Sequence, residues 1–242
     1  MIKDEQDYLD EWLNYHLNLG INEIYLYEDY NSISHLPITD KYGEKVKLFS
    51  IDEIFTNETN DKMWGRQEKL YDWFIVNNKK NFDWVLFIDI DEFLILTCDL
   101  QTLLEEYSDQ TGILLHWKWY GASGHINKPD GGVMENYTIE SPNPFDYWWS
   151  HKSFLNIKNF SGWSKHVHEI KNAVFPLTDW GSHKAYLNHY FTKSWEEWKT
   201  KLFSRGDVCP GHRKLEHFFL FNPDMLGIKD DLIPKNINSI TN

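Results

Sequence analysis

The sequence contains two cysteines, a minority of basic residues and no long apolar segment. Cys98 and Cys209 are far apart and do not have the spacing of metal ligands. They favour reduced thiols in a cytosolic protein, with a single disulfide as the alternative. No apolar run approaches the roughly 20 residues that span a bilayer. The opening MIKDEQDYLDEW also lacks the basic and apolar regions of a signal peptide. We therefore expect a cytoplasmic protein.

Positive charge is scarce relative to negative charge. The sequence has 24 Lys and Arg residues and 37 Asp and Glu residues, which gives a formal net charge of −13. This balance argues against nucleic acid or an anionic membrane as the main partner, because both attract positively charged proteins. No nucleic-acid partner is therefore expected.

Aromatic residues, in contrast, are abundant. They make up 17% of the 242 residues and include 12 Trp and 13 Tyr. Packing in the core is the default role for such residues, and stacking against sugar rings is the functional alternative. The length predicts one domain, residues 1–242, with a sizeable core.

Helices and strands are predicted to alternate through the first half of the chain. Apolar residues at helical spacing predict helices at 7–19, about 62–78 and 99–107. Short apolar runs predict strands at 22–29, 46–51, 84–88 and 112–121. The strand at 84–88 is apolar at every position, as expected for a central strand covered on both faces. This alternation favours an α/β sheet with parallel strands, in which ligands bind at the carboxyl ends of the strands.

The second half of the chain is less regular. Residues 121–181 are rich in Gly, Pro, Asn, Trp and His and have weak periodicity. Long irregular segments of this kind are more often functional or mobile than idle. A strand at 185–191 and a helix at 194–206 are predicted to follow, with Ser194 and Glu197 in the positions of a capping box.

Three carboxylates interrupt the apolar segment WVLFIDIDEFLIL at residues 84–96. They are Asp89, Asp91 and Glu92. In one interpretation the two aspartates hold Mn²⁺ or Mg²⁺ at the end of a strand, because hard carboxylate oxygens suit these ions and leave positions open for substrate phosphates. In a second, the motif belongs to a phosphatase of the haloacid-dehalogenase type, but Phe93 stands where those enzymes usually carry Thr or Val. In a third, the acids are helix caps or ion-paired residues without catalytic function.

Several motifs follow one another in order over roughly residues 2–206. They are KDEQDYLDEWLNYHLNLGINEIYLYED at 3–29, Arg66-Gln67, WVLFIDIDEFL at 84–94, WKWYGASGH at 117–125 and NHYFTKSWEEWKTK at 188–201. Together they resemble glycosyltransferase family 92 and its bacterial relatives in the family-2-like group. The combination is far more specific than any single motif.

The resemblance implies a GT-A fold, a Rossmann-like α/β arrangement with a mixed, mostly parallel sheet flanked by helices. It implies an enzyme that transfers a hexose from a nucleotide-diphosphate donor, a UDP-sugar, to a glycan or lipid-linked acceptor with inversion. Residues 1–110 would bind the nucleotide sugar, residues 111–206 would face the acceptor and complete the metal site, and 207–242 would form a C-terminal tail. Surface polysaccharide biosynthesis at the inner face of the membrane, with peripheral association, is the implied setting.

The same resemblance assigns roles to individual residues. Asp89 and Asp91 become the D-x-D motif that holds Mn²⁺ or Mg²⁺, with Asp91 the more direct ligand, and Glu92 supports the turn after them. Asp89 also contacts the nucleotide sugar. The other nucleotide-sugar-binding positions are Lys3, Asp4, Glu5, Asp29 and Arg66.

The chain departs from the family pattern at its start. Family members have an apolar strand before the position of Lys3, whereas this sequence begins Met1-Ile2-Lys3. We therefore expect either that the sheet lacks its first strand, which normally forms one wall of the base pocket, or that the start of the sequence has been clipped. This departure supports an alternative function, a catalytically weak carbohydrate-binding protein on a degenerate GT-A fold.

The 11 histidines include candidates for metal binding and catalysis. By likeness, His189 matches the late histidine that completes the metal site in GT-A enzymes. His168 is its rival, and with His166 it would point to one face of an extended segment. His125, in a glycine-rich loop, is our candidate for the base that takes the acceptor proton, with a loop-structuring role as the alternative. The sequence does not single it out from the other candidate bases, which are Glu135, Glu140, Glu169 and Asp179.

Overall fold

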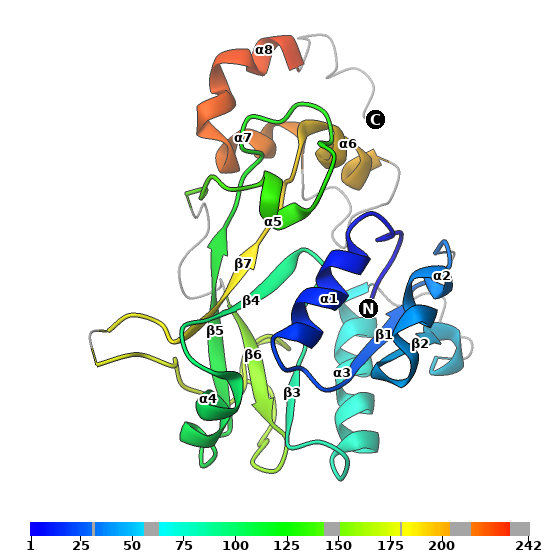
Figure 1. The fold of residues 1–242 in the computed structure, drawn as a ribbon, viewed down its shortest axis with the longest axis vertical. Helices are drawn as coiled ribbons and strands as arrows, with labels where there is room; N and C mark the ends of the chain where they lie inside the picture. Colours follow the sequence, from blue (N-terminus) through cyan, green and yellow to red (C-terminus); the bar gives the residue numbers. More distant parts are fainter. Residues whose placement is uncertain (31, 56–62, 143–150, 180, 204–213, 233–242) are drawn as a thin grey trace. The chain divides into compact units, whose positions relative to one another are not determined.

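The chain forms two compact units. The computed structural model describes residues 1–242 except 31, 56–62, 143–150, 180, 204–213 and 233–242 (Figure 1). The first unit comprises Met1–Trp117 with Trp148–Asn188, and the second comprises Lys118–Tyr147 with His189–Asn242. The assignment of residues 1–242 to one functional domain stays a prediction.

The first unit alternates helices and strands, as the sequence predicts. Its helices are α1 (Leu9–Asn18), α2 (Leu36–Thr39), α3 (Met63–Asn78) and α4 (Leu100–Glu106), with 3₁₀ turns at Asp40–Lys45 and Ile51–Glu53. Its strands are β1 (Ile24–Glu28), β2 (Val46–Ser50), β3 (Trp84–Leu86), β4 (Glu92–Leu96), β5 (Gly112–Trp119), β6 (His151–Asn156) and β7 (Ala185–His189), and the last residues of β5 and β7 belong to the second unit. The α/β class is therefore confirmed.

The strands form two sheets. β1 and β2 pair in parallel, and a second sheet has the order β3-β6-β5-β7-β4 (Figure 1). β6 pairs antiparallel with both β3 and β5. The expectation of a mostly parallel sheet is therefore not confirmed. The central placement of 84–88 is wrong, because β3 lies at one edge of the second sheet, where only β6 pairs with it among the described strands.

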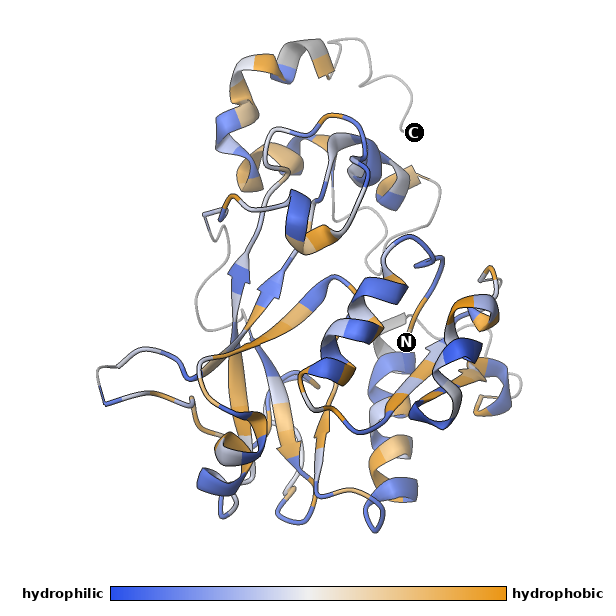
Figure 2. Cartoon of the chain, viewed as in Figure 1, coloured by the Kyte–Doolittle hydropathy of each residue, from blue (hydrophilic) through white to orange (hydrophobic). Residues whose placement is uncertain are grey.

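Helices cover the second sheet on opposite sides of β6. Phe154 of β6 packs with Leu103 of α4 and with Ile113 of β5. The next residue, Leu155, points the other way and packs with Ile75 of α3, since successive side chains of a strand alternate between its faces. Figure 2 shows apolar residues along much of β5 and β6. Both faces of β6 are thus buried, and all six of its residues lie in the interior.

A cavity of about 800 Å³ lies in the first unit between β1 and β3. Residues 24–27 and 84–88 line it from two sides, and Tyr71 and Phe74 of α3 also contribute. One edge of β1 pairs with β2. On the other edge, among the described residues, Glu28 forms one parallel bridge, with Ile2. Ile2 donates its N–H to Tyr27 and accepts from the N–H of Asp29, each at 2.8 Å. The absence of a first strand stays a prediction.

Helix α1 covers the outer edge of β4 and satisfies its backbone with side chains. The Trp12 indole N–H donates to the carbonyl oxygen of Glu92 at 2.8 Å, and the Tyr15 hydroxyl donates to that of Leu94 at 2.8 Å. The Leu94 N–H donates to His16 Nε2 at 3.3 Å, and His16 Nδ1 is 2.8 Å from the carbonyl oxygen of Trp12. These bonds fix β4 from its first residue, Glu92. Gly20, at φ +106°, follows the helix as predicted.

The second unit contains α5 (Val133–Asn136), α6 (Trp195–Phe203), α7 (Phe218–Phe221) and α8 (Lys229–Leu232), with 3₁₀ turns at Leu215–His217 and Pro223–Ile228. The predicted capping box is confirmed, because the Ser194 N–H donates to Glu197 at 3.1 Å and the Glu197 N–H donates to Ser194 Oγ at 3.2 Å. Among the described residues of both units, no helix has the length and apolar character needed to cross a bilayer.

The pH dependence of stability tests the role of His16. Burial lowers the pKa of His16 from 6.5 to about 4, so the unfolded chain binds more protons than the folded chain between these values. The stabilisation is complete above pH 6.5 and is lost as the pH falls toward 4, by about 3 kcal/mol in total from this residue. Urea unfolding of the wild type and His16→Gln between pH 4 and 7.5 should give a shallower pH profile for the variant. Parallel profiles would show that His16 is not the group responsible.

Candidate functional site

The acidic residues form a tight turn between β3 and β4. Asp89 follows β3 by three residues, and Glu92 is the first residue of β4. The Glu92 N–H donates to the carbonyl oxygen of Asp89 at 3.1 Å, and the Asp89 N–H donates to the Glu92 carboxylate at 3.0 Å. Glu92 is fully buried, whereas the Asp89 side chain is 43% exposed. Glu92 thus supports the turn, as the resemblance implies, and Asp89 faces solvent.

A buried lysine from β6 provides the positive charge at this turn. Lys152, whose side chain is 1% exposed, places Nζ 2.9 Å from Asp89 Oδ2 and 3.7 Å from Glu92 Oε1. The same ammonium group donates to His168 Nε2 at 3.2 Å and lies 5.8 Å from the ring centre of Trp117. The ammonium group therefore has a carboxylate partner, an imidazole acceptor and an aromatic face around it.

These contacts determine the charges at the turn. Partial burial opposes ionisation of Asp89, but the attraction of Lys152 prevails and holds the pKa of Asp89 below its ordinary value. Burial also opposes the charged form of Lys152, yet Asp89 and Glu92 raise its pKa above the ordinary value. Burial and the charge of Lys152 lower the pKa of His168 well below 6.5. At neutral pH the site therefore combines an ionised Asp89, a charged Lys152 and a neutral His168.

The turn offers oxygen ligands for a hard divalent cation. Asp89 and Asp91 supply carboxylates that suit Mn²⁺ or Mg²⁺, and both side chains are partly accessible. Asp89 Oδ2 and His168 Nε2 already converge on the ammonium group of Lys152. Cation binding by Asp89 and Asp91, and by His168 as a rival ligand, stays a prediction.

The first residues of the chain and the loop after β1 are joined by hydrogen bonds. The backbone N–H groups of Asp4 and Glu5 donate to Ser32 Oγ at 3.2 Å and to His35 Nε2 at 2.9 Å. Asp4 in turn accepts from the Ile33 N–H at 2.9 Å. Two of the three predicted positions Lys3, Asp4 and Glu5 are thus held against one loop. Their contact with a nucleotide stays a prediction.

Asp29 and Arg66 pair with each other. Arg66 Nη1 lies 3.3 Å from Asp29 Oδ1, and Arg66 Nη2 donates to Asp29 Oδ2 at 3.4 Å. The guanidinium group also lies 4.9 Å from the ring centre of Tyr30. Asp29 and Asp89 both contribute to the electrostatic field at the nitrogen of Met1, so the two acidic positions lie around the same N-terminal segment.

The candidate base and the candidate late metal ligand belong to the second unit. The His125 N–H donates to the carbonyl oxygen of Ala122 at 2.9 Å, and its own carbonyl accepts from the Trp195 N–H at 3.2 Å, so its loop is tied to the start of α6. His189 is 6% exposed, with its ring 4.5 Å from that of Trp119 and 5.4 Å from that of Phe191. Catalysis by His125 and metal binding by His189 stay predictions.

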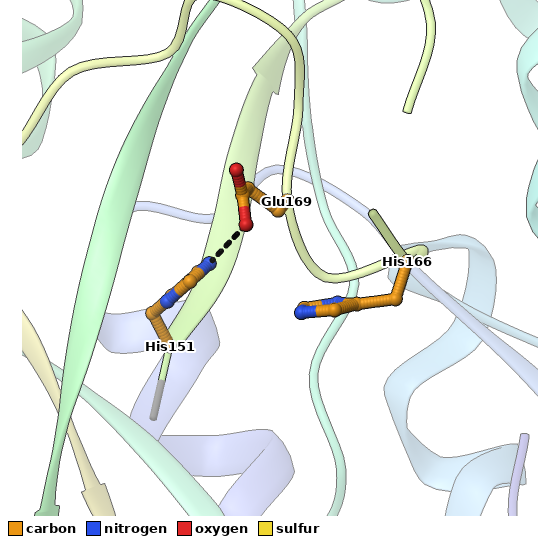
Figure 3. Close-up of side chains that lie close together, drawn as sticks. All are labelled: His151, His166 and Glu169. Carbon is orange, nitrogen blue, oxygen red and sulfur yellow. Dashed lines mark ion pairs between the residues drawn. The ribbon is translucent and has the colours of Figure 1, made fainter. Parts of the chain in front are cut away.

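The segment with His166 and His168 is a turn rather than the extended segment that we expected. The Glu169 N–H donates to the carbonyl oxygen of His166 at 3.0 Å, which closes the turn. His168 points to Lys152, whereas His166 lies with Glu169 and His151 of β6 in a second cluster (Figure 3). His151 Nε2 and Glu169 Oε2 are 3.7 Å apart. Glu169, which we considered as a base, is therefore part of a group that could hold a metal ion.

Lys152 and His151 are the residues of these sites that sequence reasoning missed. They begin the strand HKSFLN, whose six residues are all buried. A strand buried on both faces has no alternation of apolar and polar residues, and this one starts with two polar residues. The one feature of the sequence that could have indicated these residues is a lysine next to a short apolar run within the irregular segment 121–181.

The chain is similar to one family of proteins along most of its length. The family model for glycosyltransferase family 92 matches residues 2–215. A family 92 protein of Arabidopsis thaliana is 25% identical over 221 residues, which cover 85% of this chain and 36% of that protein. A family 92 protein of Oryza sativa subsp. japonica is 30% identical over 152 residues, which cover 60% of this chain and 24% of that protein. The chain thus spans about a third or less of the length of these relatives. These matches confirm the resemblance that the motifs indicated.

Replacing Lys152 tests whether its charge holds the acidic turn together. Lys152→Met should lower the free energy of unfolding by about 2 kcal/mol, because it leaves the partly solvated Asp89 without its counter-charge, whereas burial already raises the pKa of Glu92. Lys158→Met is the matched control. Lys158 pairs with Asp83 on the surface, where both side chains are 70% exposed, so the loss should stay below about 1 kcal/mol. Equal losses in urea unfolding at pH 7.5 would contradict the role of Lys152.

Proposed function

Because the chain belongs to glycosyltransferase family 92, we propose that it binds a nucleotide-diphosphate sugar at the Asp89–Asp91 turn and transfers the sugar to a glycan. The observation that carries the proposal is the turn itself. It presents an ionised, partly exposed Asp89 next to Asp91, and it is held by the buried Lys152 and Glu92. A structural ion pair alone would not require a second, partly exposed carboxylate residue two positions away.

The proposed donor is a UDP-sugar, and the proposed cation is Mn²⁺ or Mg²⁺ held by Asp89 and Asp91. When bound, the cation supplies positive charge to the diphosphate leaving group. Lys152 keeps Asp89 ionised and hence ready for the cation. The role of Arg66 is to contact the diphosphate, and that of Asp29 is to read the ribose or the base.

The transfer itself is proposed to invert the anomeric configuration. An acceptor hydroxyl oxygen attacks the anomeric carbon, the bond from this carbon to the diphosphate oxygen breaks, and the hydroxyl proton passes to a base. His125 is the proposed base, and His189 is the proposed late ligand of the cation. The proposed acceptor is a glycan or a lipid-linked sugar in surface polysaccharide biosynthesis, at the cytoplasmic face of the membrane.

Calorimetric titration with UDP and GDP, each with and without Mn²⁺, tests the donor site. Wild-type protein should bind UDP only with Mn²⁺, because the cation offsets the repulsion between the carboxylates and the diphosphate. Asp91→Ala should weaken this binding by at least about tenfold, since it removes a ligand of the cation. Glu106→Ala should bind like the wild type, because Glu106 is exposed, pairs with Lys184 and does not line the cavity between β1 and β3.

Two outcomes would contradict the proposal. Binding of equal strength in Asp91→Ala would place the nucleotide elsewhere. If the folded protein binds neither nucleotide, the carbohydrate-binding alternative becomes the better account. Glycan binding that needs neither nucleotide nor metal would then identify it.

A further inference from the structure

Two histidines and one glutamate of the first unit converge outside the acidic turn. Their potential ligand atoms, from His151, His166 and Glu169, all lie within 4.8 Å of one another. Figure 3 shows the three side chains directed toward a common space, with His151 on β6 and the other two on the facing loop. The rings of His151 and His166 have their centres 5.8 Å apart. Two imidazoles and one carboxylate at this spacing are a set of ligands that transition-metal ions use.

His151 is buried without hydrogen bonds to its ring. It is 3% exposed, and neither ring nitrogen has a hydrogen-bond partner within the part of the chain that the structure describes. Buried polar side-chain atoms in proteins are nearly always hydrogen-bonded, so an exception calls for an explanation such as an absent ion. Burial also lowers the pKa of His151 to about 4, so the imidazole is neutral at physiological pH and its lone pair does not compete with a proton.

The loop that carries the other two residues is held in place by its backbone. The Ser164 N–H donates to the carbonyl oxygen of Glu169 at 2.8 Å, and Trp163 forms an antiparallel bridge with Ile170. The Ser153 hydroxyl, on β6, donates to the carbonyl oxygen of His168 at 2.6 Å. His166 and Glu169 are therefore presented together by one turn that is fastened to the strand of His151.

We propose that His151, His166 and Glu169 bind one Zn²⁺ ion, with a fourth position left for water. Zinc accepts imidazole nitrogen and carboxylate oxygen together, and sites with two histidines and one glutamate leave an open position. The ion would satisfy His151 and join the loop to β6. The site uses neither Asp89 nor Asp91 and does not depend on nucleotide binding, so it goes beyond the proposed transferase function.

Zinc binding would also act on the neighbouring turn. The His168 N–H donates to His166 Nδ1 at 3.2 Å, so a neutral His166 carries its proton on Nε2. To bind zinc through Nε2, the ring must move this proton to Nδ1. A neutral imidazole that binds a metal through Nε2 carries its proton on Nδ1, so this hydrogen bond is given up when zinc binds. Zinc binding would therefore free the backbone N–H of His168, the residue whose ring accepts a hydrogen bond from Lys152.

The test measures zinc binding in the absence of nucleotide, on the tag-free 242-residue chain stripped of metal. Competition with a chromophoric chelator gives affinity and stoichiometry, and Co²⁺ in place of Zn²⁺ reports the ligand field through its visible absorption. We expect one ion per chain. Glu169→Gln and His166→Gln, which change partly exposed side chains, should each weaken binding at least about tenfold. The thermal midpoint should rise with zinc in the wild type and not in these variants.

Two controls separate this site from others. His183→Gln removes a histidine of the same unit outside the cluster, and Asp91→Ala removes the D-x-D motif; both should bind zinc like the wild type. The proposal is overturned if the wild type binds no zinc, if Glu169→Gln and His166→Gln bind like the wild type, or if Asp91→Ala loses the ion. Because no nucleotide is present, a failure of UDP binding would leave these results unchanged.

Discussion

The buried ammonium group of Lys152 is the constraint on which the acidic turn depends. Carboxylates in apolar surroundings are costly unless a counter-charge or hydrogen bonds compensate for their lost hydration. Lys152 reaches Asp89 because β6 runs antiparallel to β3, with Leu86 opposite Phe154. The chain that continues past β3 is then led toward the start of β6, where Lys152 lies. The antiparallel pairing is thus what allows this sequence to place its acidic residues at this turn. If β6 ran parallel to β3, the end of β6 instead of its start would lie beside the acidic turn, and Lys152 would be far from Asp89.

The other side of the turn is fixed by α1. Glu92 begins β4, whose outer edge would expose backbone groups. Trp12, Tyr15 and His16 satisfy those groups with side-chain atoms instead of another strand. His16 suits this task because a neutral imidazole has one donor and one acceptor, which match the carbonyl oxygen of Trp12 and the N–H of Leu94. The helix and β6 together hold the acidic turn at both of its ends, so that the exposed part of Asp89 is presented by a rigid frame.

The features that the sequence predicted are those determined by nearby residues. The capping box of Ser194 and Glu197, the stop at Gly20 and the turn of Asp89 to Glu92 each involve groups within a few positions of one another. What could not be predicted depends on distant partners. β6 has no alternating pattern because both of its faces are buried. An apolar run such as WVL reads the same at the centre of a sheet and at an edge beside a cavity. The carboxylate partners of Lys152, Asp89 and Glu92, are 60 or more positions away in sequence, beyond the reach of any local pattern.

The arrangement of charges has a consequence for how the proposed cation would bind. Lys152 lowers the pKa of Asp89 and so keeps a carboxylate ready for a cation, but its own positive charge repels a divalent ion nearby. The two effects oppose each other for the cation alone. A nucleotide diphosphate removes the conflict, because its negative charge is attracted by both the ammonium group and the cation. The buried lysine would therefore make cation and nucleotide bind together more strongly than either alone. The charge of Lys152, which stabilises the acidic turn, would thus also favour the complex of the protein with both cation and nucleotide.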